Sequence, residues 1–75
     1  SHLAYEALGE VHARLEMVTD WIESFQKGVI YYLADGRVRG VLLWNVWDQA
    51  PAARELFAAP GPVHPDDLMG RLSAG

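Results

Sequence analysis

The sequence predicts an α+β fold, in which an antiparallel β-sheet is followed by two short C-terminal helices. A β-hairpin is predicted over about residues 29–45, because two runs of β-branched and aromatic residues flank the turn-forming pair Asp35-Gly36. Good helix formers dominate the last third of the chain, where Pro51 and Pro65 stand at positions that suit the first turn of a helix. Strands therefore come first and helices last.

Two further strands are predicted before the hairpin. Tyr5–Leu8 is a short strand candidate, and Val11–Thr19 alternates between apolar and polar residues with the period of a half-buried strand. Thr19–Lys27 has apolar residues at helical spacing, but it stays open whether this stretch extends the strand or is an irregular connection. Gly40 interrupts the second strand of the hairpin, which indicates a β-bulge or a close backbone neighbour.

Two helices are predicted after the hairpin. Ala50–Ala58 is the first, with Asp48 as the candidate N-cap, whose carboxylate accepts a hydrogen bond from a free backbone N–H. The second starts at Pro65 and carries Asp66 and Asp67 in its first turn, where carboxylates are favoured by the helix dipole. Its apolar side is expected to be buried and comprises Leu68, Met69 and Leu72.

Composition excludes several classes of partner. Six Lys and Arg residues against ten Asp and Glu residues give a formal net charge of −4, so the chain lacks the basic character of a nucleic-acid-binding protein. The same charge disfavours an anionic membrane, and no apolar run is long enough to cross a bilayer. There is no cysteine, which excludes disulfides and agrees with a reducing, cytoplasmic location. Residues 1–75 are predicted to form a single domain, because so short a chain can build only one small core.

No catalytic, cofactor-binding or metal-binding residue is predicted in this chain. The seven glycines do not form a nucleotide-binding motif, and His2, His12 and His64 are too far apart in the sequence for the spacing of a zinc site. Asp66 and Asp67 are adjacent on a predicted helix and therefore do not face each other. The chain by itself is not expected to be an enzyme.

Aromatic residues are numerous for so small a core, with three Trp, three Tyr and two Phe. Trp44 and Trp47 bracket the end of the second hairpin strand, with Asn45 between them. They are either core residues beside a capping Asn or anchors of an interface, and the sequence leaves both interpretations open. The strand is apolar on both faces, which indicates that both of its sides are covered. The predicted interface residues are Trp44, Trp47, Tyr32, Val41 and Leu43.

A family likeness is carried by Lys27–Leu33, Val38–Asn45 and Ala53–Leu56, and more weakly by Tyr5–Gly9. Together these segments resemble the C-terminal domain of apoptosis-inducing factor and of its bacterial relatives. Those proteins are FAD-dependent pyridine-nucleotide oxidoreductases of the ferredoxin-reductase type. Residues 10–27 depart from the family pattern, and the long insertion that apoptosis-inducing factor carries in this region is not present.

The resemblance implies a larger parent flavoprotein, in which an FAD domain and an NAD(P)H domain precede this one. It implies that this domain packs on the FAD domain, contributes to dimer contacts or to the docking of a redox partner, and is not catalytic alone. FAD and NAD(P)H are then expected in the parent enzyme and not on these residues, which look like a truncated piece. The alternative is a free-standing module for protein interaction or homodimerisation, with a Trp-rich edge.

Overall fold

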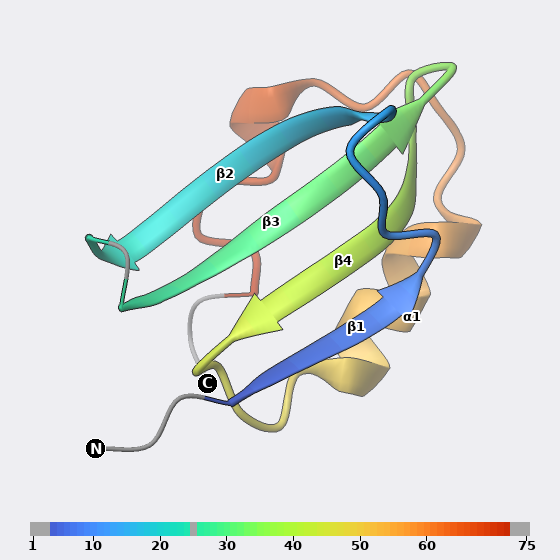
Figure 1. Ribbon diagram of the computed structural model, residues 1–75. Coiled ribbons are helices and arrows are strands. Elements are labelled where there is room, and N and C mark those ends of the chain that lie inside the picture. Colours follow the sequence, from blue (N-terminus) through green and yellow to red (C-terminus); the bar gives the residue numbers. More distant parts are fainter. Residues whose placement is uncertain (1–3, 25, 73–75) are drawn as a thin grey trace.

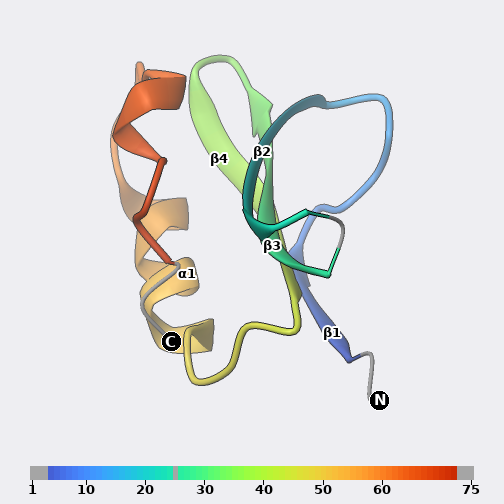
Figure 2. The ribbon, with the colours of Figure 1, turned by 90° about the vertical axis from the view of Figure 1, so that its left-hand side faces the viewer.

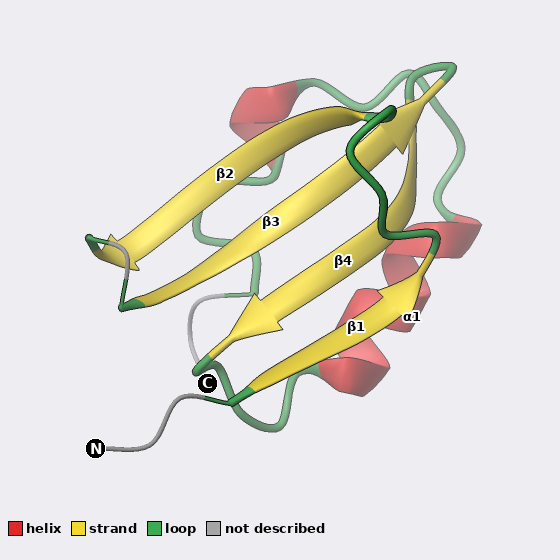
Figure 3. Ribbon diagram, in the orientation of Figure 1, coloured by secondary structure: helices red, strands yellow, loops and turns green. Residues whose placement is uncertain are grey.

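The computed structural model describes residues 4–24 and 26–72, which fold into a four-stranded antiparallel sheet beside a layer of helical segments (Figures 1 and 3). The sheet has the strand order β1-β4-β3-β2, so the first two strands of the sequence lie at opposite edges. The predicted antiparallel sheet is confirmed. The elements are β1 (Tyr5–Gly9), β2 (Glu16–Glu23), β3 (Lys27–Ala34), β4 (Arg37–Trp44), α1 (Ala50–Ala58) and the 3-10 helix η1 (Pro65–Asp67).

The hairpin of β3 and β4 forms the centre of the sheet, as predicted. Its turn residues Asp35 and Gly36 have φ angles of 54° and 73°, the left-handed conformation that the Asp-Gly pair favours. Tyr32 is paired with Gly40, whereas the next residue of β3 is paired with Val38. Arg39 is therefore the extra residue of a β-bulge, which is one of the two features that Gly40 indicated.

The predicted position of the second strand is wrong. The alternating segment Val11–Thr19 becomes a strand only from Glu16 onward, and β2 then continues to Glu23. Because β1 and β2 lie at opposite edges, residues 10–15 are needed to cross the whole sheet and do not form part of a strand. Among the alternatives left open for Thr19–Lys27, extension of the strand is correct as far as Glu23. His12, expected on the solvent side of a strand, is exposed in this crossing loop.

The helical segments cover one face of the sheet and leave the other without a helix. Figure 2 shows α1 and the C-terminal segment on one side of the sheet and the crossing loop, residues 10–15, on the other. The core lies under the helical layer, where side chains of β1, β3, β4, α1 and the C-terminal segment meet and Val18 of β2 packs against them. Its most deeply buried members are Tyr31, Leu43, Leu68, Leu72, Val29, Val38 and Val41.

The first predicted helix is confirmed, since α1 spans Ala50–Ala58 with a proline in its first turn. Asp48 is not the N-cap. It has a φ of 62°, and the cap position is taken by Gln49, whose side chain makes no capping hydrogen bond. Neither α1 nor η1, the helices of the described residues, is long and apolar enough to span a membrane.

The second predicted helix is wrong, because only the three-residue 3-10 helix η1 forms after Pro65. Gly70 follows with a φ of 74°, a left-handed conformation that stops helix propagation. Leu68 and Leu72 are buried as predicted, but Met69 points away from the core and is 44% exposed. His64 caps η1 through a hydrogen bond that its Nδ1 accepts from the backbone N–H of Asp66 at 3.1 Å.

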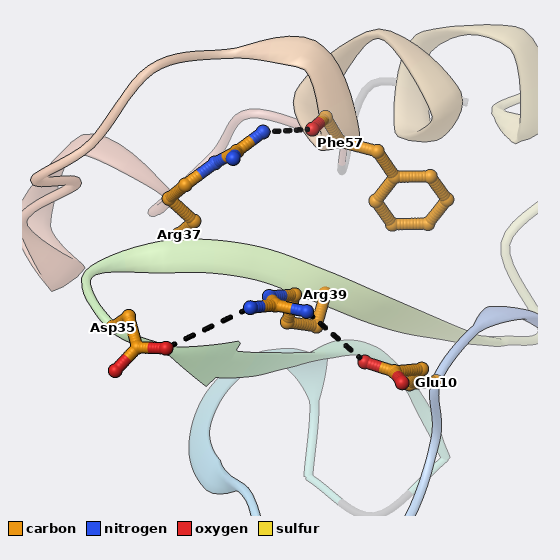
Figure 4. A network of polar contacts seen from close by, with 5 residues as sticks. All are labelled: Glu10, Asp35, Arg37, Arg39 and Phe57. Carbon is orange, nitrogen blue, oxygen red and sulfur yellow. Dashed lines mark hydrogen bonds and ion pairs between the residues drawn. The ribbon is translucent and has the colours of Figure 1, made fainter.

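Polar contacts link the crossing loop and the hairpin turn to one end of the sheet (Figure 4). The Arg39 guanidinium lies 3.6 Å from the Glu10 carboxylate and 3.7 Å from the Asp35 carboxylate, so the bulge residue is linked to both the crossing loop and the hairpin turn. Arg37 donates a hydrogen bond of 3.0 Å to the carbonyl oxygen of Phe57 near the end of α1. These side chains are largely exposed, so each ion pair contributes little to stability and the network mainly fixes position.

The crossing loop begins directly over Gly40. A Cβ atom at this position would collide with the carbonyl oxygen of Glu10, and its carbonyl carbon would be only 2.6 Å away. The backbone N–H of Glu10 also donates a hydrogen bond of 2.9 Å to the carbonyl of Arg39. The close backbone approach is thus the second feature that the glycine in β4 indicated.

Gly40→Ala is expected to lower the free energy of unfolding by about 1–3 kcal/mol, because the added methyl group must displace the backbone of the crossing loop. Denaturant unfolding followed by tryptophan fluorescence measures the loss. Thr19→Val is the control, since it changes an exposed strand residue of β2 and should stay within about 0.5 kcal/mol of the original protein. Equal stabilities of the Gly40→Ala protein and the control would contradict the close approach.

Tyr31 is the largest fully buried side chain and holds the C-terminal segment against the sheet. Its hydroxyl donates a hydrogen bond of 3.0 Å to the carbonyl oxygen of Leu68. Burial, helped by the negative charge of Asp20, raises the pKa of Tyr31 to about 12. The folded protein therefore keeps this proton at a pH where the unfolded chain has already lost it.

Raising the pH from 10 to 12 is expected to destabilise the domain, since unfolding lets Tyr31 ionise near pH 10 whereas the folded state resists ionisation until about pH 12. This difference lowers the free energy of unfolding by roughly 2–3 kcal/mol. Denaturant titrations at successive pH values should show that Tyr31→Phe removes this dependence and that Tyr5→Phe keeps it. An unchanged pH dependence in the Tyr31→Phe protein would refute the assignment.

Candidate interaction surface

The face of the sheet that no helix covers is almost entirely apolar. Pairing registers place eleven residues on it, because directly opposed residues point to the same side and neighbours along a strand alternate. Gly9, which is paired with Gly40, is left out because its φ of 73° departs from the strand conformation. This surface, termed the open face, comprises Tyr5, Ala7, Met17, Thr19, Trp21, Gly28, Ile30, Tyr32, Gly40, Leu42 and Trp44. None of these side chains is charged. An uncharged face of this extent on a chain with 21% charged residues is a candidate binding surface.

A groove of about 590 Å³ lies on the open face along β1 and β4. The rings of Tyr5 and Trp44 are stacked there, with centroids 6.2 Å apart and an interplanar angle of 24°. They meet because they are directly opposite each other in the pairing of β1 with β4. Val11 of the crossing loop forms another part of the lining. The full lining consists of Ala4, Tyr5, Ala7, Val11, Leu42 and Trp44.

Exposure varies along the open face. Met17 is half exposed and Tyr5 more so, whereas Tyr32 is only 6% exposed. Tyr32 is paired with Gly40, the residue over which the crossing loop runs, so it lies at the covered end. Trp44 is half-buried, and its indole Nε1 is buried without a hydrogen-bond acceptor among residues 4–24 and 26–72. An unsatisfied buried donor costs about 1–3 kcal/mol, so this ring is held in place by packing.

The structure separates the five predicted interface residues into three groups. Tyr32 and Trp44 lie on the open face. Trp47 lies in the loop between β4 and α1 and is 57% exposed. Val41 and Leu43 point to the other side of β4, where they are at most 1% exposed within the core. They belong to the packing of the domain itself and are not part of the open face.

The Trp-rich region is also not a strand edge. β4 lies between β1 and β3, so its backbone is paired on both sides. Trp44 is therefore presented by the surface of the sheet and not by its rim. Sequence reasoning also missed Tyr5, Met17, Ile30 and Leu42, although steps of two from Trp44 and Tyr32 would have found Leu42 and Ile30.

Asn45 forms side-chain hydrogen bonds with two segments that are distant in the sequence, at Ala4 beside the groove and at Gln26. Its Oδ1 accepts a hydrogen bond of 2.9 Å from the N–H of Ala4, and its Nδ2 donates one of 2.7 Å to the carbonyl oxygen of Gln26. Its own backbone N–H donates to the carbonyl of Ala4 at 2.7 Å. Asn45 has a φ of 55°, a conformation that asparagine tolerates better than most residues. A capping Asn, one of the two interpretations that the sequence left open, was expected to bond nearby backbone, whereas the side-chain hydrogen bonds of Asn45 reach distant segments.

The chemistry available on the open face is that of apolar contact. Among the described residues, no group of three or more His, Asp or Glu side chains is placed to hold a metal ion. The Tyr31 hydroxyl lies on the opposite side of β3, where it is bonded to Leu68. Charged contacts, such as that of Arg39 with Glu10, stand at one end of the sheet. The surface is suited to bind an uncharged, apolar partner.

Residues 14–59 match the family model described as "Apoptosis-inducing factor, mitochondrion-associated, C-term". The matched range includes β2, β3, β4 and α1, and with them most of the open face. The chain belongs to this family. The match to the apoptosis-inducing factor C-terminal domain extends through residues 14–27, part of the segment expected to depart from the pattern, whereas β1 lies outside it.

Asn45→Ala is expected to lower the free energy of unfolding by about 2 kcal/mol, because it removes two side-chain hydrogen bonds and strains the left-handed backbone. Asn45→Asp keeps an acceptor for the N–H of Ala4 but loses the donor to Gln26, so its loss should be about half as large. Thermal unfolding measures both. A reversed order, with the Asp variant less stable than the Ala variant, would show that the bridge does not act as described.

Proposed function

We propose that this chain is the C-terminal domain of an FAD-dependent NAD(P)H oxidoreductase of the ferredoxin-reductase or apoptosis-inducing-factor type. Its role is structural: it packs on the FAD domain and is not catalytic alone. The observation that carries the proposal is membership of the apoptosis-inducing factor C-terminal family, together with an uncharged open face that lacks a covering layer. A sheet with one such face is stabilised by a neighbouring domain.

The described residues do not fit a flavin site of their own. The groove is lined by apolar and aromatic side chains and contains no cation that could pair with a pyrophosphate. FAD and NAD(P)H are therefore assigned to the domains that precede this one in the parent enzyme, and no catalytic step is derived for these residues. When bound there, the two groups supply hydride and electron transfer.

Location and assembly are further parts of the proposal. The chain has no cysteine, which supports a reducing compartment, and we place the parent enzyme in the cytoplasm of a bacterium. A redox protein is its expected electron-transfer partner. The second candidate function is a free-standing module that forms a homodimer, and the exposed apolar residues of the open face favour it.

The longer polypeptide that contains this domain is expected to be yellow when purified and to bleach when NADH or NADPH is added under nitrogen, because hydride transfer reduces the flavin. Visible absorption spectroscopy measures both effects. The 75-residue chain, titrated with FAD as the control, should give no binding signal. A colourless parent protein would overturn the redox assignment, and tight binding of FAD by the 75 residues would overturn the purely structural role.

A further inference from the structure

We propose that the open face is the surface on which this domain packs against the preceding polypeptide of the same chain, with the groove between Tyr5 and Trp44 at the centre of the contact. This inference rests on the proposed function and assigns the face that does the packing. The occupant is an uncharged, aliphatic or aromatic protein surface that is covalently joined to the N-terminal side of this domain.

The absence of charged side chains on the open face indicates the chemistry of the surface that packs on it. All eleven residues of the open face are uncharged, although the domain as a whole carries a formal charge of −4. A polar or charged partner surface would lose its hydration on this face without gaining compensating partners. On the helical face, the apolar side chains of the described strands pack in the core, and the exposed Trp47 and Met69 lie in segments outside the sheet.

The position of the N-terminal end places the preceding polypeptide beside the groove. Ala4 lines the groove, and both its N–H and its carbonyl are hydrogen-bonded to Asn45. Figure 2 shows the beginning of β1 away from α1. Because the matched family is described as a C-terminal one, polypeptide that precedes this domain would reach it through Ala4.

The size of the open face suits a neighbour on the same chain. Four strands spaced about 4.8 Å apart, with a rise of about 3.3 Å per residue, give a face of roughly 500 Å² and an interface of roughly 1,000 Å² in total. Contacts between domains of one chain bury about 600–1,500 Å², whereas a stable complex of separate chains buries about 1,200–2,000 Å². A covalent link compensates for the smaller area by raising the effective concentration to about the millimolar range.

The sheet edges do not favour a second copy as the occupant. The hydrogen bonds that join Asn45 to Ala4 and Glu10 to Arg39 imply that only Tyr5, Ala7 and Gly9 turn their backbone groups outward from β1. Gly9 ends this strand with a φ of 73°. The other edge, β2, has a glutamate at each end, so antiparallel pairing of two copies would bring like charges together.

The two methionines of the chain provide the test, because they lie on opposite faces with similar exposure. Met17 on the open face is 50% exposed, and Met69 beside the helical layer is 44% exposed. Dilute hydrogen peroxide converts exposed methionine to sulfoxide, and peptide mass spectrometry gives the rate at each site. In the 75-residue chain at low concentration the two rates should be similar. In the longer polypeptide, Met17 should react about tenfold more slowly while Met69 keeps its rate.

Equal rates at Met17 and Met69 in a yellow, NADH-reducible parent would overturn this inference and leave the proposed function standing. Protection of Met17 in the 75-residue chain that increases with concentration would assign the face to a second copy and also overturn it. A colourless parent would instead count against the proposed function.

A pair of arginine substitutions supplies an independent readout. Thr19→Arg adds a positive charge to the open face, and Glu55→Arg replaces a negative charge with a positive one at an exposed position of α1. Circular dichroism should show that both variants of the 75-residue chain remain folded. In the parent, only Thr19→Arg should lower the melting temperature and release the domain to limited proteolysis. Equal behaviour of the two parent variants would contradict the assigned face.

Discussion

The central constraint on this molecule is that one α-helix and one 3-10 helix must cover a sheet that has two faces. The helical layer is enough for one of them, and the core forms there around Tyr31, Val41 and Leu43. On the other face lies the loop of residues 10–15, which crosses one end of the sheet between β1 and β2. The exposed apolar surface is therefore a consequence of topology and chain length, and not of a few unusual side chains.

Features governed by neighbouring residues could be predicted from the sequence, whereas features set by distant pairing could not. The Asp35-Gly36 hairpin and α1 depend on turn chemistry and helix propensity, and both are found where the pattern indicates. The start of β2 depends on the crossing between opposite edges, which alternation along the sequence does not reveal. Met69 was expected in a second helix, but only the short η1 forms there and Gly70 follows in a left-handed conformation.

The candidate surface shows the same division. A strand that is apolar on both sides indicates that both sides are covered, but it does not say which residues face the core of the domain and which face outward. Val41 and Leu43 proved to be core residues, whereas Leu42 and Trp44 face outward. The helix above β4 decides between the two sets, and its position is known only from the three-dimensional structure. One side of the groove, formed by β1, also lies outside the region that matches the family.

The bridge made by Asn45 has a mechanical consequence. Both backbone groups of Ala4 are fastened to Asn45, and the same side chain reaches the turn between β2 and β3 through Gln26. A force applied at the N-terminal end is thus shared between two separate parts of the sheet before it reaches the pairing of β1 with β4. Release of β1 from β4 therefore also requires the hydrogen bonds between Ala4 and Asn45 to break.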